Sequence, residues 1–177
     1  MSAASSQKRV VSDVAAFDPE RLIRTLHSHR VRFVLIGALA ARLHGFPRLT
    51  ADADITPASD KPNLDRLAAA LRELDARVYT ESVPEGLVFD CSAATLSRAT
   101  TWNLVTDAGR LDLAFVPAGT KGYDDLAKGA ERFKAFGVEF DAASLDDIIR
   151  SKEAAGRPRD LDDVVLLRAL KRRRARE

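Results

Sequence analysis

The chain has 177 residues, which at roughly 150 residues per domain predicts a single domain. Its hydrophobic content of 46%, with only 9 glycines and 7 prolines, excludes a collagen-like, low-complexity or mostly disordered chain. The formal net charge of +2 is unevenly distributed, because residues 171–177 hold five Lys and Arg against one Glu and so carry +4, leaving −2 on the rest.

The sequence predicts neither a membrane span nor a secretory signal. The longest uncharged apolar run, residues 33–41, is nine residues long, whereas a helix that spans a bilayer needs roughly 20. Asp13 interrupts the apolar stretch that follows the N-terminal basic pair. The single cysteine, Cys91, cannot form an internal disulfide. We therefore expect a cytoplasmic protein without a membrane partner.

The first half of the chain predicts helices that alternate with short apolar strands. Residues 1–17 are small and polar, and we expect a flexible arm. Asp18 is a predicted N-cap before Pro19 at the first position of a helix. The elements predicted next are a buried strand at 32–36 closed by Gly37, a short helix at 39–44, an extended segment at 51–55 and an amphipathic helix at 63–74.

The second half predicts strands and then a helical end. The predicted strands are 87–89, 102–106 and 110–115, the last two joined by a turn at 107–109, and short runs at 132–136 and 138–140. Ser144 caps a helix that ends near Ala155. A second helix is predicted at 160–170, with a buried face formed by Leu161, Val164, Val165 and Leu170.

These elements predict an α/β (α+β) fold. A small mixed sheet is flanked by helices and followed by a helical C-terminal segment. The predicted organisation is a single domain at 18–170 with a basic tail at 171–177. The cations of this tail either contact nucleic-acid phosphates or belong to a solvated helix end.

Three acids are the first candidates for chemistry. Asp52 and Asp54 are two residues apart in a strand, so their side chains leave the same face with Cα atoms about 6.5 Å apart. Asp112 lies on the polar side of an otherwise apolar strand. Such carboxylates suit Mg²⁺, and three of them could hold two metal ions ~3.5–4 Å apart. The alternatives are a solvated pair at a sheet edge and, for Asp112, a salt bridge to an arginine.

A second signal is the pair Gly37-Ala38, which begins a helix directly after a strand. Backbone N–H groups at that position could hold an anionic phosphate, and Gly37 permits a close approach of the backbone.

Two separated motifs resemble known families. The first consists of residues 35–40, His44-Gly45, residues 47–50 and Asp52-Ala53-Asp54-Ile55, and it resembles the polymerase-beta-like nucleotidyltransferase superfamily. The second, residues 151–164, resembles the Lys…Arg-x-[Arg/Lys]-Asp-x-x-Asp element of AbiEii-like toxins. Together they cover about residues 31–170.

The resemblance implies a nucleotidyltransferase fold and a residue-by-residue site. Asp52, Asp54 and Asp112 would bind Mg²⁺ in a two-metal site, Lys152 would contact the triphosphate of an NTP, and Asp160 would complete the catalytic set. It further implies the toxin of a toxin–antitoxin pair, acting on tRNA and controlled by a cognate antitoxin protein. The alternatives are nucleotidylation of a protein or of a small molecule such as an aminoglycoside.

One residue departs from the family pattern: Ala38 stands where Gly or Ser is usual. A degenerate nucleotide-binding regulatory module is therefore a further alternative. Arg48 and Arg157 are predicted phosphate contacts, although Arg48 could instead pair with Asp52, and Arg157 with Asp162 or Asp163. His44 is predicted to be a packed or surface histidine rather than a general base.

Overall fold

The computed structural model describes residues 15–176. Most of the arm predicted for residues 1–17 therefore lies outside the described residues. Within them, seven strands form one mixed sheet in the order β3-β4-β5-β2-β1-β7-β6. The strands are β1 (Phe33–Ile36), β2 (Asp52–Pro57), β3 (Arg77–Val78), β4 (Thr101–Thr106), β5 (Gly109–Ala114), β6 (Glu131–Ala135) and β7 (Val138–Ala142).

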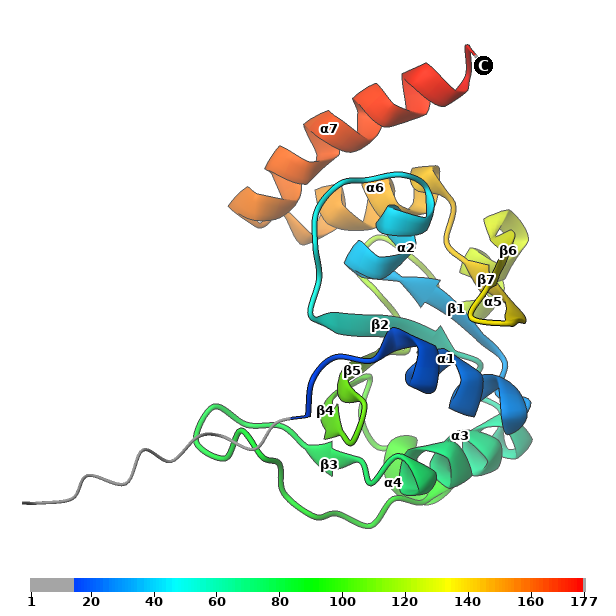
Figure 1. Cartoon of the computed structure of the whole chain (residues 1–177), viewed down its shortest axis with the longest axis vertical. Coiled ribbons are helices and arrows are strands. Elements are labelled where there is room, and N and C mark those ends of the chain that lie inside the picture. Colours follow the sequence, from blue (N-terminus) through cyan, green and yellow to red (C-terminus); the bar gives the residue numbers. More distant parts are fainter. Residues whose placement is uncertain (1–14, 177) are drawn as a thin grey trace, which may run out of the picture.

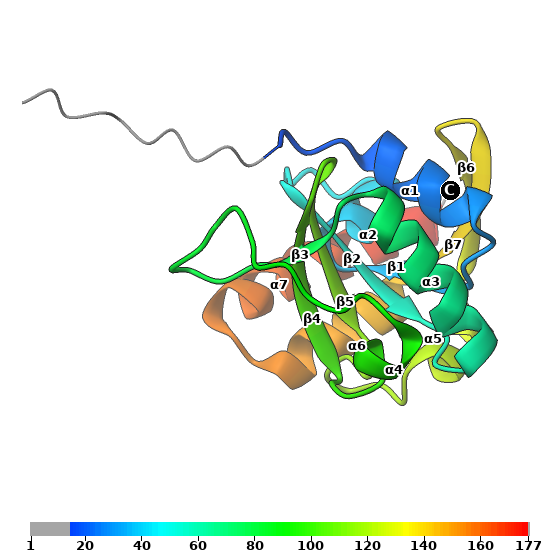
Figure 2. The same ribbon diagram turned by 90° about the horizontal axis from the view of Figure 1, so that it is seen from below.

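Helices cover both faces of the sheet (Figure 1). They are α1 (Pro19–Ser28), α2 (Gly37–Leu43), α3 (Lys61–Glu73), α4 (Ala93–Leu96), α5 (Tyr123–Gly129), α6 (Leu145–Ala155) and α7 (Pro158–Arg174). Figure 2 shows α1 and α3 side by side over one face, while α2, α6 and α7 lie on the other. None of the helices within residues 15–176 combines the length and the apolarity that crossing a membrane requires.

The main hydrophobic core lies between the sheet and the pair α1 and α3. Leu22 and Ile23 of α1 and Leu67 of α3 are completely buried. β5 contributes Leu111 and Leu113 to this core, whereas the residues that alternate with them face the other side and are half-buried. The predicted alternation about Asp112 is therefore confirmed, and it separates the core from the candidate site.

Local capping signals are confirmed. The Asp18 carboxylate accepts a hydrogen bond from the backbone N–H of Arg21 at 3.0 Å. The Ser144 hydroxyl accepts one from the backbone N–H of Asp147 at 3.1 Å. Phe17, at the end of the predicted arm, packs against the core beside Gly109.

Several short elements differ from the prediction. The expected strand at 87–89 is wrong, because only Leu87 pairs, through a single bridge to Val78 of the short edge strand β3. The helices α4 and α5 were not predicted, since each is short and α5 buries only Leu126. Neither helix has an apolar face long enough to be recognised from the sequence.

The last helix, α7, is longer than predicted and buries a different set of residues. α7 extends to Arg174, so most of the basic tail is helical. Leu161 and Val165, expected on the buried face, are 47% and 67% exposed. The buried residues are Asp160, Asp163, Val164, Leu167 and Leu170. On this side Val164, Leu167 and Leu170 pack on the body of the protein, and the two acids bind a lysine of α6, as described below.

Candidate active site

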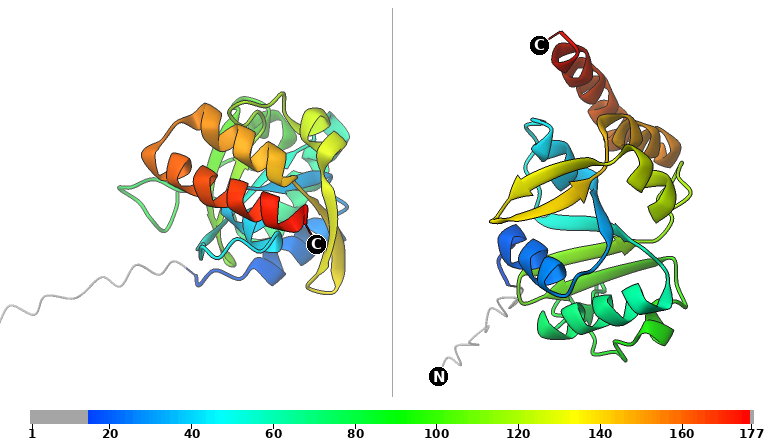
Figure 3. Two further views of the ribbon diagram at one scale, coloured as in Figure 1. Left: turned by 90° about the horizontal axis from the view of Figure 1, so that it is seen from above. Right: turned by 90° about the vertical axis from the view of Figure 1, so that its right-hand side faces the viewer.

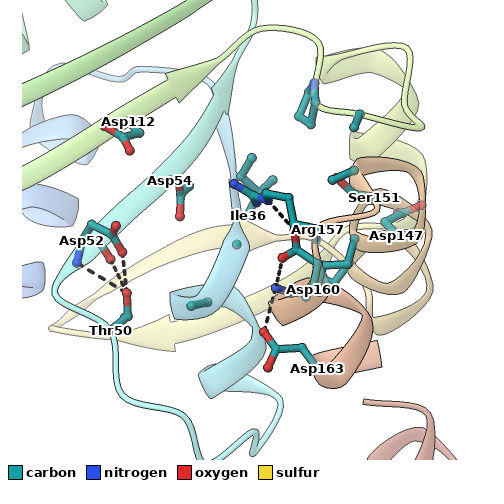
Figure 4. A pocket seen from close by; sticks show the side chains of 18 of the residues that line it. Ile36, Thr50, Asp52, Asp54, Asp112, Asp147, Ser151, Arg157, Asp160 and Asp163 are labelled. Atoms are coloured by element: carbon teal, nitrogen blue, oxygen red, sulfur yellow. Dashed lines mark hydrogen bonds and ion pairs between the residues drawn. The ribbon is translucent and has the colours of Figure 1, made fainter. Parts of the chain in front are cut away.

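Three carboxylates meet on β2 and β5. β2 runs parallel to β5, with Asp54 directly beside Asp112 in the register and Asp52 two residues earlier on the same face. Figure 4 shows these three acids together on one wall of a cleft. The Thr50 hydroxyl donates a hydrogen bond to one Asp52 oxygen at 2.5 Å, which fixes the orientation of that carboxylate.

The proximity of these acids changes their acidity. Burial, together with the charges of Asp52 and Asp112, raises the pKa of Asp54 from 3.8 to about 7. Burial also raises the pKa of Asp112, against the opposing charge of Arg110, which lies 3.7 Å away. The arginine partner considered for Asp112 is therefore present, but it leaves one carboxylate oxygen buried and without a hydrogen-bond partner in the described residues.

The glycine turn lies against the same acids. β1 is antiparallel to β2 and places Ile36 beside Asp54, so that α2 begins at Gly37 in contact with the Asp54 side chain. Gly37 has φ +67°, and a Cβ there would collide with the Asp54 carboxylate. Only glycine combines this backbone conformation with the close approach. Ala38 follows it in the wall of the cleft.

The opposite wall carries cations, of which Lys152, Arg157 and Arg48 are held by acids of α7. Lys152 of α6 donates hydrogen bonds to Asp160 and Asp163, both at 2.9 Å. Arg157 donates from Nε to the second oxygen of Asp160 at 2.5 Å. Burial opposes ionisation of Asp160, but the hydrogen bonds from Arg157 and Lys152 hold its pKa below the ordinary value.

Arg48 joins this cluster from the loop that precedes β2. Its guanidinium lies 2.5 Å from Asp163, so the acid that it pairs with is Asp163 and not Asp52, the alternative that the sequence left open. Arg157 likewise pairs with Asp160 and not with Asp162 or Asp163. Asp163 was not among the predicted site residues, although its place three residues after Asp160 puts both acids on one side of a helix.

The two walls enclose one cleft of about 740 Å³. All of the predicted site residues line it: Gly37, Ala38, Arg48, Asp52, Asp54, Asp112, Lys152, Arg157 and Asp160. His44 is outside it, buried and bonded through Nε2 to the carbonyl of Ala143 at 2.8 Å, which confirms that it is a packed histidine.

The acidic wall has the donor chemistry of a divalent-cation site. Oxygen-only ligands suit Mg²⁺, and the raised pKa of Asp54 reflects its burial and the charges of two neighbouring carboxylates, although Asp112 also has an arginine, Arg110, 3.7 Å away. Within residues 15–176, however, no group of three or more His, Cys, Asp or Glu side chains is placed so that it could hold a metal ion by itself. Water and substrate oxygens would therefore complete the coordination shell.

Comparisons with known proteins establish the fold. No family model and no curated protein matches the chain. The lincosamide antibiotic adenylyltransferase LnuA, solved with lincomycin bound, is similar with a TM-score of 0.57 at 12% identity, over 88% of this chain and 99% of LnuA. The antibiotic-resistance factor ANT(2'')-Ia gives 0.49 at 18% identity, over 88% and 89%. The likeness to LnuA shows that this chain has a nucleotidyltransferase fold, as the first motif predicted.

Proposed function

We propose that this protein is a Mg²⁺-dependent nucleotidyltransferase that transfers a nucleoside monophosphate from an NTP to an acceptor hydroxyl. The hydroxyl oxygen bonds to the α-phosphorus, the bond from that phosphorus to the β-phosphate oxygen breaks, and pyrophosphate leaves. The hydroxyl proton passes to a cleft carboxylate or to water. The observation that carries the proposal is one cleft with three carboxylates on one wall and Lys and Arg side chains on the other.

The cationic wall retains donors for a triphosphate. An ammonium group has three N–H donors, and Lys152 uses two of them on the α7 acids, which leaves one for a phosphate oxygen. Arg157 uses Nε on Asp160, and its side chain is 76% exposed at the cleft. Its terminal nitrogens are free to bind phosphate in the forked geometry that guanidinium provides.

The acidic wall would hold the metal ions. Asp52, Asp54 and Asp112 are the ligands that this chain offers, and bound Mg²⁺ supplies charge neutralisation at the reacting phosphate. Thr50 keeps Asp52 oriented, and Gly37 leaves the room that the Asp54 carboxylate occupies. Catalysis by these residues is mainly positioning and electrostatic stabilisation.

Two acceptor classes are each favoured by one observation. The resemblance of residues 151–164 to AbiEii-like toxins favours a tRNA 3′ end and the toxin of a toxin–antitoxin pair, and the exposed arginines at the end of α7 suit an RNA backbone. The likeness to LnuA, whose name states that it adenylylates a lincosamide antibiotic, favours a small-molecule hydroxyl. A cleft of about 740 Å³ has the size of a small-ligand pocket.

The test is a transfer assay with each α-labelled NTP, Mg²⁺ and either total tRNA or a panel of lincosamide and aminoglycoside antibiotics. Asp54→Asn should lower transfer by a factor of at least about 10³, because it removes a charge that acts at the reacting phosphate. Asp65→Asn, an exposed position on α3 paired with Lys61, is the matched control and should keep full transfer.

The acceptor that takes the label identifies the substrate class. Label on tRNA supports the toxin function, and label on an antibiotic supports the resistance function. NTP binding by calorimetry without transfer to any acceptor would contradict the enzyme proposal and support the regulatory module that Ala38 allows.

A further inference from the structure

Three large apolar residues, interrupted by the exposed Asp162, lie on the side of α7 that faces solvent. Its opposite side packs on the body of the protein through Val164 and Leu167. On the outer side, Leu161, Val165 and Leu166 are 47%, 67% and 52% exposed, and we call these three residues the outer stripe. α7 forms the outermost layer over α6 (Figures 1 and 3). Large apolar side chains gathered on one exposed helix face are typical of an interaction site.

Cations without partners follow the outer stripe along the same side of the helix. Arg172 lies two helical turns beyond Val165, and Arg173 and Arg176 adjoin it. All three are exposed, and none has an ion pair within residues 15–176.

The remaining cations of this half of α7 are engaged by the body of the protein. Arg168 pairs with Glu153, and Lys171 pairs with Asp146. Arg174 bonds to the buried His44 at 2.6 Å and lies 3.5 Å from Glu131. The helix is therefore fixed by its inner cations, while the outer arginines stay available to a partner.

The outer stripe and the three exposed arginines together favour one kind of partner. A nucleic-acid backbone would use the arginines but would gain nothing from the outer stripe, whose free energy is released only against another apolar surface. A second copy of this chain, paired antiparallel through its outer stripe, would bring Arg172 and Arg173 close to Arg157 and Arg159 of the other copy. Parallel pairing would set the same arginines against their own counterparts. Both arrangements oppose like charges.

We propose that the outer face of α7 binds an amphipathic, acidic helical segment of another protein. Apolar side chains of that segment, spaced three and four residues apart, would pack on the outer stripe, as in other helix-to-helix recognition. Glu or Asp residues about two turns along would pair with Arg172, Arg173 and Arg176. The proposal concerns the side of α7 opposite to Asp160 and Asp163, and it holds whether or not the chain transfers nucleotides.

The test uses two synthetic helical peptides with the same leucine stripe, one flanked by Glu and the other by Lys, titrated into the full chain by fluorescence anisotropy. The Glu peptide should bind at least tenfold more tightly than the Lys peptide at low salt, and the difference should shrink as salt screens the charges. Val165→Asp and the double variant Arg172→Glu/Arg173→Glu should each weaken the Glu peptide at least tenfold.

The matched control is Val88→Asp, because Val88 is 89% exposed and lies in the loop between β3 and α4. This variant should bind the Glu peptide like the unmodified chain, and thermal melts should show that all variants fold. Equal binding of the two peptides, or unchanged binding by Val165→Asp, would overturn the proposal. So would a dimer in analytical ultracentrifugation that Val165→Asp dissociates, because the outer stripe would then be occupied by a second copy.

Discussion

Replacing Asp54 by Asn should stabilise the metal-free protein at neutral pH. The folded protein favours the neutral carboxyl, since burial and two neighbouring acids raise the pKa of Asp54 from 3.8 to about 7. The unfolded chain loses this proton near pH 3.8, whereas the folded protein keeps it to about pH 7. Stability is therefore lost as pH rises between these values and stays low above them. Asparagine, which carries no charge, removes this penalty.

The size of the pKa shift of Asp54 determines the expected gain in the free energy of unfolding. At about 1.4 kcal/mol per pKa unit, the full rise corresponds to roughly 4 kcal/mol above pH 7. Asp54 is half-buried at the cleft, and solvent screening reduces this to an expected gain of about 2 kcal/mol. At pH 4 the gain should fall below about 1 kcal/mol, because this pH lies only just above the pKa of the unfolded carboxyl and the penalty has barely begun to accumulate.

Urea unfolding in EDTA at pH 4 and pH 8 measures the difference, with Asp65→Asn as the exposed control expected to change stability by less than about 0.5 kcal/mol. Adding Mg²⁺ at pH 8 should stabilise the unmodified chain but not Asp54→Asn, because a ligand stabilises only the protein that binds it. Equal stability of the two chains at pH 8 without metal would refute the idea that the acids repel one another.

Gly37→Ala should cost about 1–3 kcal/mol of stability and most of the transfer activity, because a Cβ strains a positive φ and displaces the Asp54 carboxylate, whereas Ala38→Ser should leave the fold intact. Lys152→Met should cost about 3 kcal/mol in urea unfolding by leaving buried acids poorly paired, while the exposed control Lys61→Met should change less than about 0.5 kcal/mol. Burial raises the pKa of Cys91 to about 11, so its alkylation by iodoacetamide should be slow at pH 8 and should rise about tenfold per pH unit up to pH 10; a fast, pH-independent reaction would contradict this.

Local sequence patterns, which involve residues only a few positions apart, predicted most of the fold. The cap of Asp18, the alternation about Asp112 and the two-residue spacing of the β2 acids each depend on neighbours within a few positions, and each recurs in the structure. The strand at 87–89 failed because an apolar run without a partner strand forms only a bridge. Pairing of Arg48 with Asp163 joins segments far apart in the chain, and no local pattern encodes it.

The wrong prediction of which side of α7 is buried has a more specific cause. Apolar residues lie on both sides of this helix, so hydrophobic spacing alone could not decide which side packs on the body. Asp160 and Asp163, which the predicted buried face did not include, lie on the packed side, where both accept hydrogen bonds from Lys152. The buried side of the helix thus combines this charged contact with the apolar packing of Val164, Leu167 and Leu170, and the same rotation turns Leu161 and Val165 outward. The acids that hold Lys152 and the exposed apolar residues of α7 are therefore two consequences of the same rotation of the helix.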